Sequence, residues 1–109
     1  MTKDEALSWI EETCGQGWLG LVDEVYTALP DGVSISQVYQ KWGVLRFDIS
    51  PDDEAFTEYL EMIEERSSRI CEKCGAAGEL RTVGSWESSL CDEHHKLEIA
   101  KAKFKNFKS

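Results

Sequence analysis

The sequence has no long apolar run: no stretch approaches the roughly 18 consecutive apolar residues that a membrane-spanning helix needs. It also begins with polar residues, Met1–Glu5, and lacks the basic start and apolar stretch of a secretory signal peptide. We therefore expect a cytoplasmic protein that contacts no membrane. Without a secretion signal, four cysteines favour a metal site over disulfides, because the cytosol keeps thiols reduced.

Basic residues are scarce in the chain. Twelve Lys and Arg stand against 21 Asp and Glu, and the net charge is −9 over 109 residues. The deficit lies in residues 1–70, which carry five basic and fifteen acidic residues, whereas residues 71–109 carry seven and six. Proteins that bind nucleic acids draw affinity from neutralising phosphates. The acidic composition of residues 1–70 therefore disfavours general nucleic-acid binding.

Recognisable catalytic motifs are also missing. The sequence contains no Ser/His/Asp arrangement, no phosphate-binding loop and no nucleophile motif. Several carboxylates lie close together at Glu58, Glu61, Glu64 and Glu65, but their spacing is typical of the solvated face of an amphipathic helix. We therefore expect a protein that is not an enzyme.

The strongest chemical signal is the pattern Cys-x2-Cys-x16-Cys-x2-His, formed by Cys71, Cys74, Cys91 and His94. Each short pair allows two side chains to reach one ion, and two such pairs supply the four ligands of a tetrahedral structural zinc site. Four protein ligands leave no open position for water or substrate, so zinc catalysis is not expected. The pattern therefore predicts a structural Zn²⁺.

Two neighbouring residues leave alternatives open. His95 competes with His94 as the fourth ligand, although His94 has the better spacing from Cys91 for one helix face. His95 is then interpreted as a surface residue, a donor to the ligand shell or a polar group of the first helical turn. Cys14 stands alone on an apolar helix face, and we interpret it as a buried free thiol.

Residues 1–70 are predicted to form a small acidic unit of helices and a β-hairpin. A capping box at Thr2 and Glu5 begins a helix over about 3–13. Apolar residues at helical spacing predict a second helix over about 18–29. A capping Ser50 followed by Pro51 predicts the start of a third helix, over about 51–69.

The hairpin is predicted over about 34–49 from apolar residues that alternate along the chain. A two-residue turn at Trp42-Gly43 would pair Val38 with Phe47 and Ser36 with Ile49. The third helix runs almost directly into Cys71, so we expect residues 1–70 and 71–109 to pack together.

Residues 71–109 are predicted to form a zinc-finger module. Cys71–Gly75 has the shape of a zinc knuckle, in which Gly75 permits the sharp reversal after the second thiolate. Two short runs around Gly84-Ser85 predict a hairpin, and a helical pattern begins at Cys91. The expected fold class is α+β, a small helical domain with a β-hairpin followed by a treble-clef-like finger of knuckle, hairpin and C-terminal helix.

Four stretches carry a resemblance that covers most of the chain from Gly15 to His94. They are Gly17-Trp18, the run from Gln37 to Phe47, Cys-Glu-Lys-Cys-Gly-Ala at 71–76, and Leu-Cys-Asp-Glu-His at 90–94. Together they resemble a group of small, largely uncharacterised zinc-finger proteins of phages, prophages and bacteria. The resemblance implies a small zinc-bearing protein, acting in the host cytoplasm if it is phage-encoded, and it implies no activity.

Two hypotheses for the function follow. The first is a protein-binding regulator or inhibitor, whose acidic surface would imitate nucleic acid and occupy a host nucleic-acid or defence enzyme. The second is a nucleic-acid-binding finger that uses the basic C-terminal helix, where lysines alternate with two aromatic residues. These residues are Lys96, Lys101, Lys103, Lys105, Lys108, Phe104 and Phe107, and Lys73 and Arg81 would extend the patch.

Overall fold

The computed structural model describes the backbone of residues 1–108 and the side chains of residues 1–104. It is an α+β structure, and its elements follow in the order α1 (Lys3–Thr13), α2 (Leu19–Ala28), β1 (Ser34–Lys41), β2 (Val44–Ser50), α3 (Glu54–Ser67), β3 (Glu79–Val83), β4 (Trp86–Leu90) and α4 (Asp92–Lys108). Each strand pair forms its own two-stranded antiparallel sheet. Within the described residues, no helix is both long and apolar enough to cross a bilayer.

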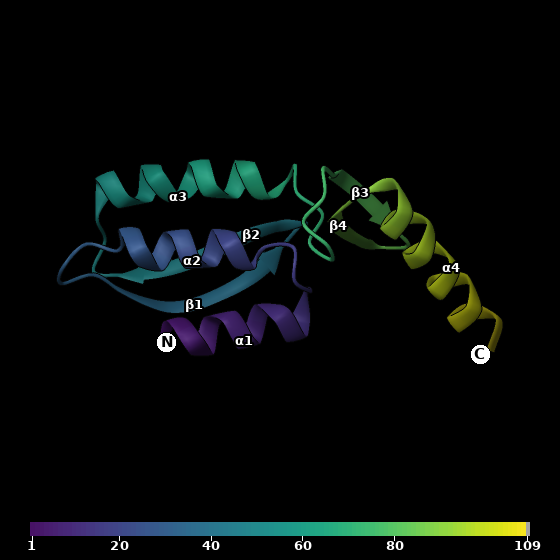
Figure 1. Cartoon of the computed structure of the whole chain (residues 1–109). Helices are drawn as coiled ribbons and strands as arrows, with labels where there is room; N and C mark the ends of the chain where they lie inside the picture. The colour runs from purple at the N-terminus through teal and green to yellow at the C-terminus, as the bar shows by residue number, and fades with distance from the viewer. Residues whose placement is uncertain (109) are drawn as a thin grey trace.

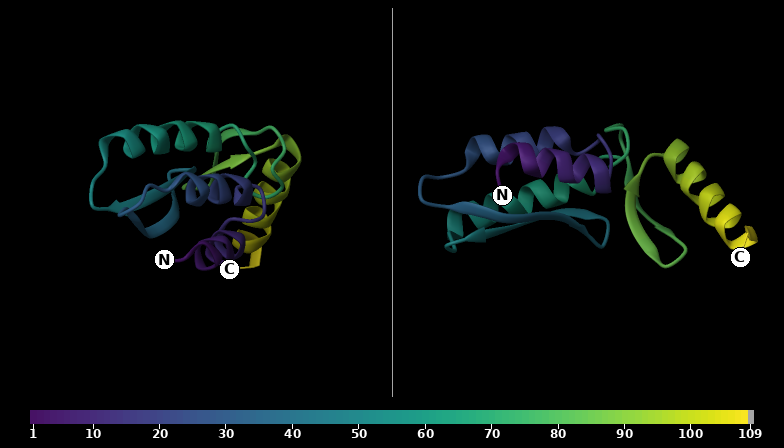
Figure 2. Two further views of the ribbon diagram at one scale, coloured as in Figure 1. Left: turned by 60° about the vertical axis from the view of Figure 1, so that its left-hand side comes forward. Right: turned by 90° about the horizontal axis from the view of Figure 1, so that it is seen from below.

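The three N-terminal helices lie on one side of the β1–β2 ribbon, as the view from below shows (Figure 2). The core between these two layers takes its apolar residues from all five elements. It is formed by Ala6, Ile10, Cys14, Trp18, Leu21, Val22, Val25, Ile35, Val38, Leu45, Phe47, Phe56, Leu60 and Ile63. Every member of this core precedes Cys71 in the chain.

The first helix begins as the sequence predicts. Thr2 accepts a hydrogen bond from the backbone N–H of Glu5, and Glu5 accepts one from the backbone N–H of Thr2. This reciprocal capping box satisfies two of the four free N–H groups at the helix start. The expected limits of α1 are confirmed, and α2 lies within the range predicted for it.

The register of the first hairpin is confirmed near the turn and wrong at its open end. Val38 pairs with Phe47, but Ile49 pairs with Ile35, and Ser36 is the extra residue of a β-bulge. Ile35 and Val38 are both buried although they lie three residues apart, an odd spacing that would put them on opposite faces of a regular strand. The bulge restores both to the core face and leaves the polar Ser36 exposed.

The third helix begins later than predicted. Residue 50 is still the last residue of β2, where Ser50 pairs with Ser34. Asp53 is the capping residue instead, and its carboxylate accepts a hydrogen bond of 2.8 Å from the backbone N–H of Phe56. Ser and Asp are both good capping residues. Because Ser50 is paired in the strand, Asp53 caps the helix.

The C-terminal module sits at one end of the elongated molecule, and α4 projects away from it (Figure 1). The predicted hairpin is confirmed as β3 and β4, which are joined at Gly84-Ser85. On α4, Leu97 is 48% exposed and Phe104 is 60% exposed. The side chain of Phe107 lies outside the described residues.

A buried tryptophan fastens α2 to the end of α3. The Trp18 side chain is fully buried, and its Nε1–H donates to the carbonyl oxygens of Ser67 and Ile70 at 3.1 and 3.0 Å. Ser67 O also accepts a hydrogen bond from the Ile70 N–H at 3.2 Å, so the indole N–H adds a second bond there and supplies a donor to Ile70 O beyond the helix end. This contact fixes the segment that leads into Cys71.

Candidate metal centre

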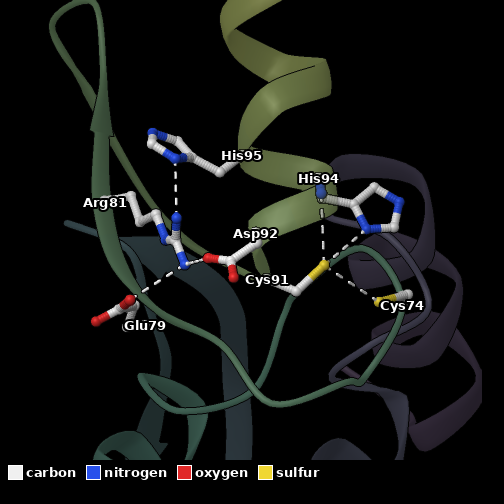
Figure 3. Close-up of polar contacts among 7 residues, drawn as sticks. All are labelled: Cys74, Glu79, Arg81, Cys91, Asp92, His94 and His95. Atoms are coloured by element: carbon white, nitrogen blue, oxygen red, sulfur yellow. Dashed lines mark hydrogen bonds and ion pairs between the residues drawn. The ribbon is translucent and has the colours of Figure 1, made fainter.

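Four side chains converge where the knuckle meets the start of α4. The ligand atoms of Cys71, Cys74, Cys91 and His94 all lie within 4.8 Å of one another. They are the four residues of the predicted motif, so the sequence spacing alone identified the cluster. Figure 3 shows Cys74, Cys91 and His94 from two separate segments pointing toward one another.

The distances between these atoms fit a tetrahedral ion. Cys91 Sγ lies 3.2 Å from His94 Nδ1 and 3.9 Å from Cys74 Sγ, and Cys71 Sγ lies 3.7 Å from His94 Nδ1. Metal bonds of about 2.3 Å to sulfur and 2.0–2.1 Å to nitrogen would place donor atoms about 3.5–3.8 Å apart in a tetrahedron. The four residues could therefore hold one metal ion, with His94 presenting Nδ1.

The knuckle is closed by backbone contacts. Gly75 has a φ of 85°, as its place after the second cysteine predicts, and its N–H donates to Cys71 O at 2.8 Å. The Cys71 N–H in turn donates to Ala76 O at 2.8 Å. These bonds hold the chain in a tight reversal, so Cys71 and Cys74 face the same point.

The second ligand pair lies at the start of α4. The Cys91 sulfur accepts a hydrogen bond from the backbone N–H of His94 at 3.4 Å, in the manner of a capping residue. The positive end of the helix dipole favours a thiolate at this position. The preceding Leu90 is fully buried, which anchors this turn to the hairpin.

The surroundings shift the pKa of Cys71 and the pKa of Cys74 in opposite directions. Burial by itself would raise the pKa of Cys71, but backbone hydrogen bonds from Cys91, Cys74 and Lys73 outweigh burial and lower the pKa. The backbone hydrogen bond from Ala76 lowers the pKa of Cys74, but burial and the neighbouring thiols raise it, and the raising effects prevail. A divalent cation among the sulfurs would favour the thiolate form of both, because metal binding deprotonates thiols.

His95 is held away from the ligand cluster. Its Nδ1 lies 2.9 Å from Arg81 Nη1, and Arg81 also donates to Glu79 at 3.1 Å and to Asp92 at 2.5 Å (Figure 3). A guanidinium has no acceptor, so the His95 nitrogen accepts this bond. The hydrogen bond from Arg81 lowers the pKa of Asp92. These contacts fix α4 on β3 and leave His94 as the fourth member of the cluster.

A buried carboxylate inside the knuckle joins it to both hairpins. Glu72 is almost fully buried, and its Oε1 accepts hydrogen bonds from Gln40 Nε2 at 2.9 Å and from the Ser89 N–H at 3.2 Å. The pKa of Glu72 is raised, because the effect of burial exceeds the lowering effect of these hydrogen bonds. Sequence reasoning missed this contact, because nothing local to Gln40, Glu72 or Ser89 signals that they meet.

The isolated cysteine is confirmed as a buried free thiol. Cys14 lies in the core of residues 1–70, and burial raises the pKa of its thiol. Its reactivity should therefore be low whatever the state of the cluster.

Cysteine alkylation should separate these two classes of thiol. After chelation and treatment with iodoacetamide, mass spectrometry of the intact chain is expected to show three modified cysteines and a protected Cys14. Before chelation no cysteine should react quickly, because Cys14 is buried and a metal ion would hold the three cysteines of the cluster. Rapid labelling of Cys14, or of the cluster without chelation, would contradict this assignment.

Comparisons with known protein families, with curated proteins and with solved structures find no match to this chain. The resemblance to small phage and bacterial zinc-finger proteins therefore stays a prediction.

Proposed function

We propose that the cluster binds Zn²⁺ and that residues 71–109 form a treble-clef-like finger with a structural metal. Three cysteine sulfurs and one imidazole nitrogen are a donor set typical of structural zinc. The order of knuckle, hairpin and helix supports the finger. One ligand pair precedes β3 and the other follows β4, so both lie at the open end of the hairpin, where Glu79 pairs with Leu90. The donor set supplies all four positions of a tetrahedron, so the ion would act as a clamp and not as a catalyst.

We further propose that the protein is a non-enzymatic regulator or inhibitor that binds another protein through an acidic surface. Thirteen of the fifteen carboxylates in residues 1–70 are exposed. Four of the five basic residues there already pair with carboxylates, in the ion pairs Lys3–Asp23, Arg46–Glu64, Arg66–Glu24 and Arg69–Glu65. Most of the exposed acidic charge is therefore left without a cationic partner nearby.

The observation that carries this proposal is a line of carboxylates along α3. Glu54, Glu58, Glu61 and Glu65 are all exposed and recur at spacings of four, three and four residues, so they share one helix face. A row of negative charges imitates one strand of a nucleic acid in its electrostatics, and would be attracted to the basic groove of a nucleic-acid enzyme. A phage source would make a host defence enzyme a natural target.

A nucleic-acid-binding finger is the second candidate, and its basic residues are partly engaged. Lys73 and Lys101 both lie within ion-pair distance of Glu98, and Arg81 pairs with Glu79 and Asp92. Lys96 and Lys103 remain exposed on α4. The side chains of Lys105 and Lys108 lie outside the described residues. The engaged cations leave less charge for phosphates, so we favour the protein-binding function.

Affinity capture from host lysate with three baits tests the proposal. The baits are the zinc-loaded chain, the E54Q/E58Q/E61Q variant and, as a matched control, the K96Q/K103Q variant. We expect a nucleic-acid enzyme to be recovered by the first and third baits and lost by the second. Capture that survives the glutamate substitutions, or capture of no specific partner, would contradict the acidic-surface proposal. Oligonucleotide binding at low salt that is lost only in K96Q/K103Q would favour the second candidate.

A further inference from the structure

Three of the four tryptophans are exposed, which is unusual for the largest apolar side chain. Trp42 is 76% exposed, Trp86 is 63% exposed and Trp9 is 47% exposed, whereas Trp18 is fully buried. Trp42 lies in the turn of the first hairpin, and Trp86 is the first residue of β4. The exposed indoles thus come from two hairpins that belong to different parts of the chain.

The backbone conformation at position 42 disfavours a tryptophan. Trp42 has a φ of 54° and Gly43 a φ of 85°, so both turn residues are in the left-handed region. Asn and Gly are the residues favoured there, and a bulky side chain at positive φ costs conformational free energy. Because the indole is mostly exposed, burial within the chain does not offset this cost. Strain of this kind points to a role outside the fold.

A hollow of about 580 Å³ lies between the two hairpins at this place. It is lined by Gln40, Lys41, Trp42, Ser85, Trp86 and Glu87. A second hollow of about 270 Å³ shares Gln40 and Trp86 with the first and is lined further by Trp9 and Tyr39. We call the two together the aromatic groove, and it brings all three exposed tryptophans onto one surface.

The walls of the groove are fixed relative to each other. Gly43 O accepts a hydrogen bond of 2.6 Å from Ser89 Oγ on β4, and a side chain at position 43 would collide with Leu80 on β3. The buried Glu72 holds Gln40 of β1 and the Ser89 N–H of β4 together. Trp42 and Trp86 are therefore presented to a ligand in a preorganised arrangement, and only while the C-terminal module is folded.

We propose that the aromatic groove binds an extended segment of a partner protein that contains proline and arginine. Polyproline segments dock on grooves lined by aromatic side chains, because their rigid, preformed helix loses little entropy on binding. The Lys41 ammonium already lies 6.0 Å from the centre of the Trp42 ring, a contact that shows the indole face accepting a cation.

Charge decides between this partner and a nucleic acid. Bases could also stack on tryptophans, but the chain carries a net charge of −9. Among the residues that line the groove, the three acidic ones outnumber the two basic ones: Glu72, Glu87 and Glu98 against Lys41 and Lys73. An arginine-bearing segment is attracted by this field, and a phosphate backbone is repelled. This inference rests on the proposed protein-binding function for its partner class, but it concerns a surface separate from the carboxylate row on α3.

The test is a titration followed through the indole N–H signals of the zinc-loaded full chain in ¹H–¹⁵N spectra. The probe is a synthetic twelve-residue peptide of alternating proline and arginine. The controls are a proline–glutamate peptide, a glycine–arginine peptide of equal charge and a twelve-nucleotide oligothymidylate. We expect the proline–arginine peptide alone to shift the Trp42 and Trp86 signals strongly, while the Trp18 signal stays in place.

Two variants separate binding from folding. Trp86→Ala and Trp42→Asn are each expected to weaken peptide binding at least about tenfold, because exposed aromatic anchors dominate such contacts. Trp42→Asn should melt at the same temperature as the parent chain or higher, since Asn-Gly is the preferred sequence for this turn. The E54Q/E58Q/E61Q variant should keep most of its affinity for the peptide.

Three results would overturn the proposal. They are the absence of any indole shift with the proline–arginine peptide, equal binding of the glycine–arginine peptide, and shifts produced by the oligothymidylate or by raising the protein concentration alone. None of these results would contradict the proposed function if partner capture still depends on the carboxylates of α3. If no partner is captured but the peptide still binds, the acidic-surface proposal is contradicted and the groove proposal is supported.

Discussion

Replacing Cys91 with serine is expected to unfold the C-terminal module while residues 1–70 stay folded. Among the described residues after position 70, only Cys71 and Leu90 are buried apolar residues, so this module has almost no hydrophobic core. Structural zinc sites contribute about 10–16 kcal/mol of apparent binding free energy in isolated finger peptides, and that energy is folding energy. The N-terminal core, in contrast, contains no residue of the module.

Amide hydrogen exchange measures this difference directly. In Cys91→Ser, or after chelation of the parent chain, the amides of β3 and β4 should exchange at least about a hundredfold faster, whereas those of α2 and β2 should keep their protection. His94→Ala should behave like Cys91→Ser. The adjacent His95→Ala is the matched control, and it should retain the metal and the protection. Protected amides in β3 and β4 of Cys91→Ser would show that the cluster does not hold the module together.

The second large effect is expected from a single added methyl group, in Gly17→Ala. A Cβ at position 17 would lie 1.8 Å from Cys71 O and 2.7 Å from Gly75 N, and both atoms belong to the backbone of the knuckle. The Gly17 N–H also donates to Glu72 O at 2.9 Å, so the loop cannot move away without losing this bond. Overpacking against backbone is costly, and we expect a loss of about 3 kcal/mol or more in the free energy of unfolding.

Gly20→Ala is the matched control for this substitution. No heavy atom lies within 4 Å of a Cβ at position 20, and the residue is in the first turn of α2. Alanine is favoured over glycine in helices, so stability should rise by up to about 1 kcal/mol. Urea unfolding compares the two variants, and a chelator competition should show weaker metal binding only in Gly17→Ala. Equal stability of the two variants would mean that the loop and the knuckle are not in contact.

Local chemistry in the sequence was enough to predict most elements. The capping box of Thr2 and Glu5, the turn at Trp42-Gly43 and the cysteine spacing each depend on residues close together in the chain, and each is found as predicted. The two errors in the elements have different causes: a choice between two capping residues at the start of α3, and a β-bulge in β1. Ser50 and Asp53 are both suitable caps, and Ile35 needed a bulge to reach the core.

The contacts between the two parts of the chain could not be predicted. Gly17 against Cys71 O, and Ser89 with Gly43 O, join residues 46 or more positions apart. Nothing in the residue types marks them as partners, and only the tertiary fold brings them together. The resemblance that covers Gly17-Trp18 and the stretch from Gln37 to Phe47 includes residues that prove to be at this junction, but it gave no indication of why. The one local clue was a tryptophan in a turn position that favours asparagine.

The metal content of the purified chain tests the central claim most directly. Native mass spectrometry of the chain expressed without added metal should show one Zn²⁺ per molecule, which is lost in Cys71→Ser and His94→Ala and kept in Cys14→Ala and His95→Ala. A chain that carries no metal, or that keeps its metal in Cys71→Ser, would contradict a zinc clamp built from Cys71, Cys74, Cys91 and His94.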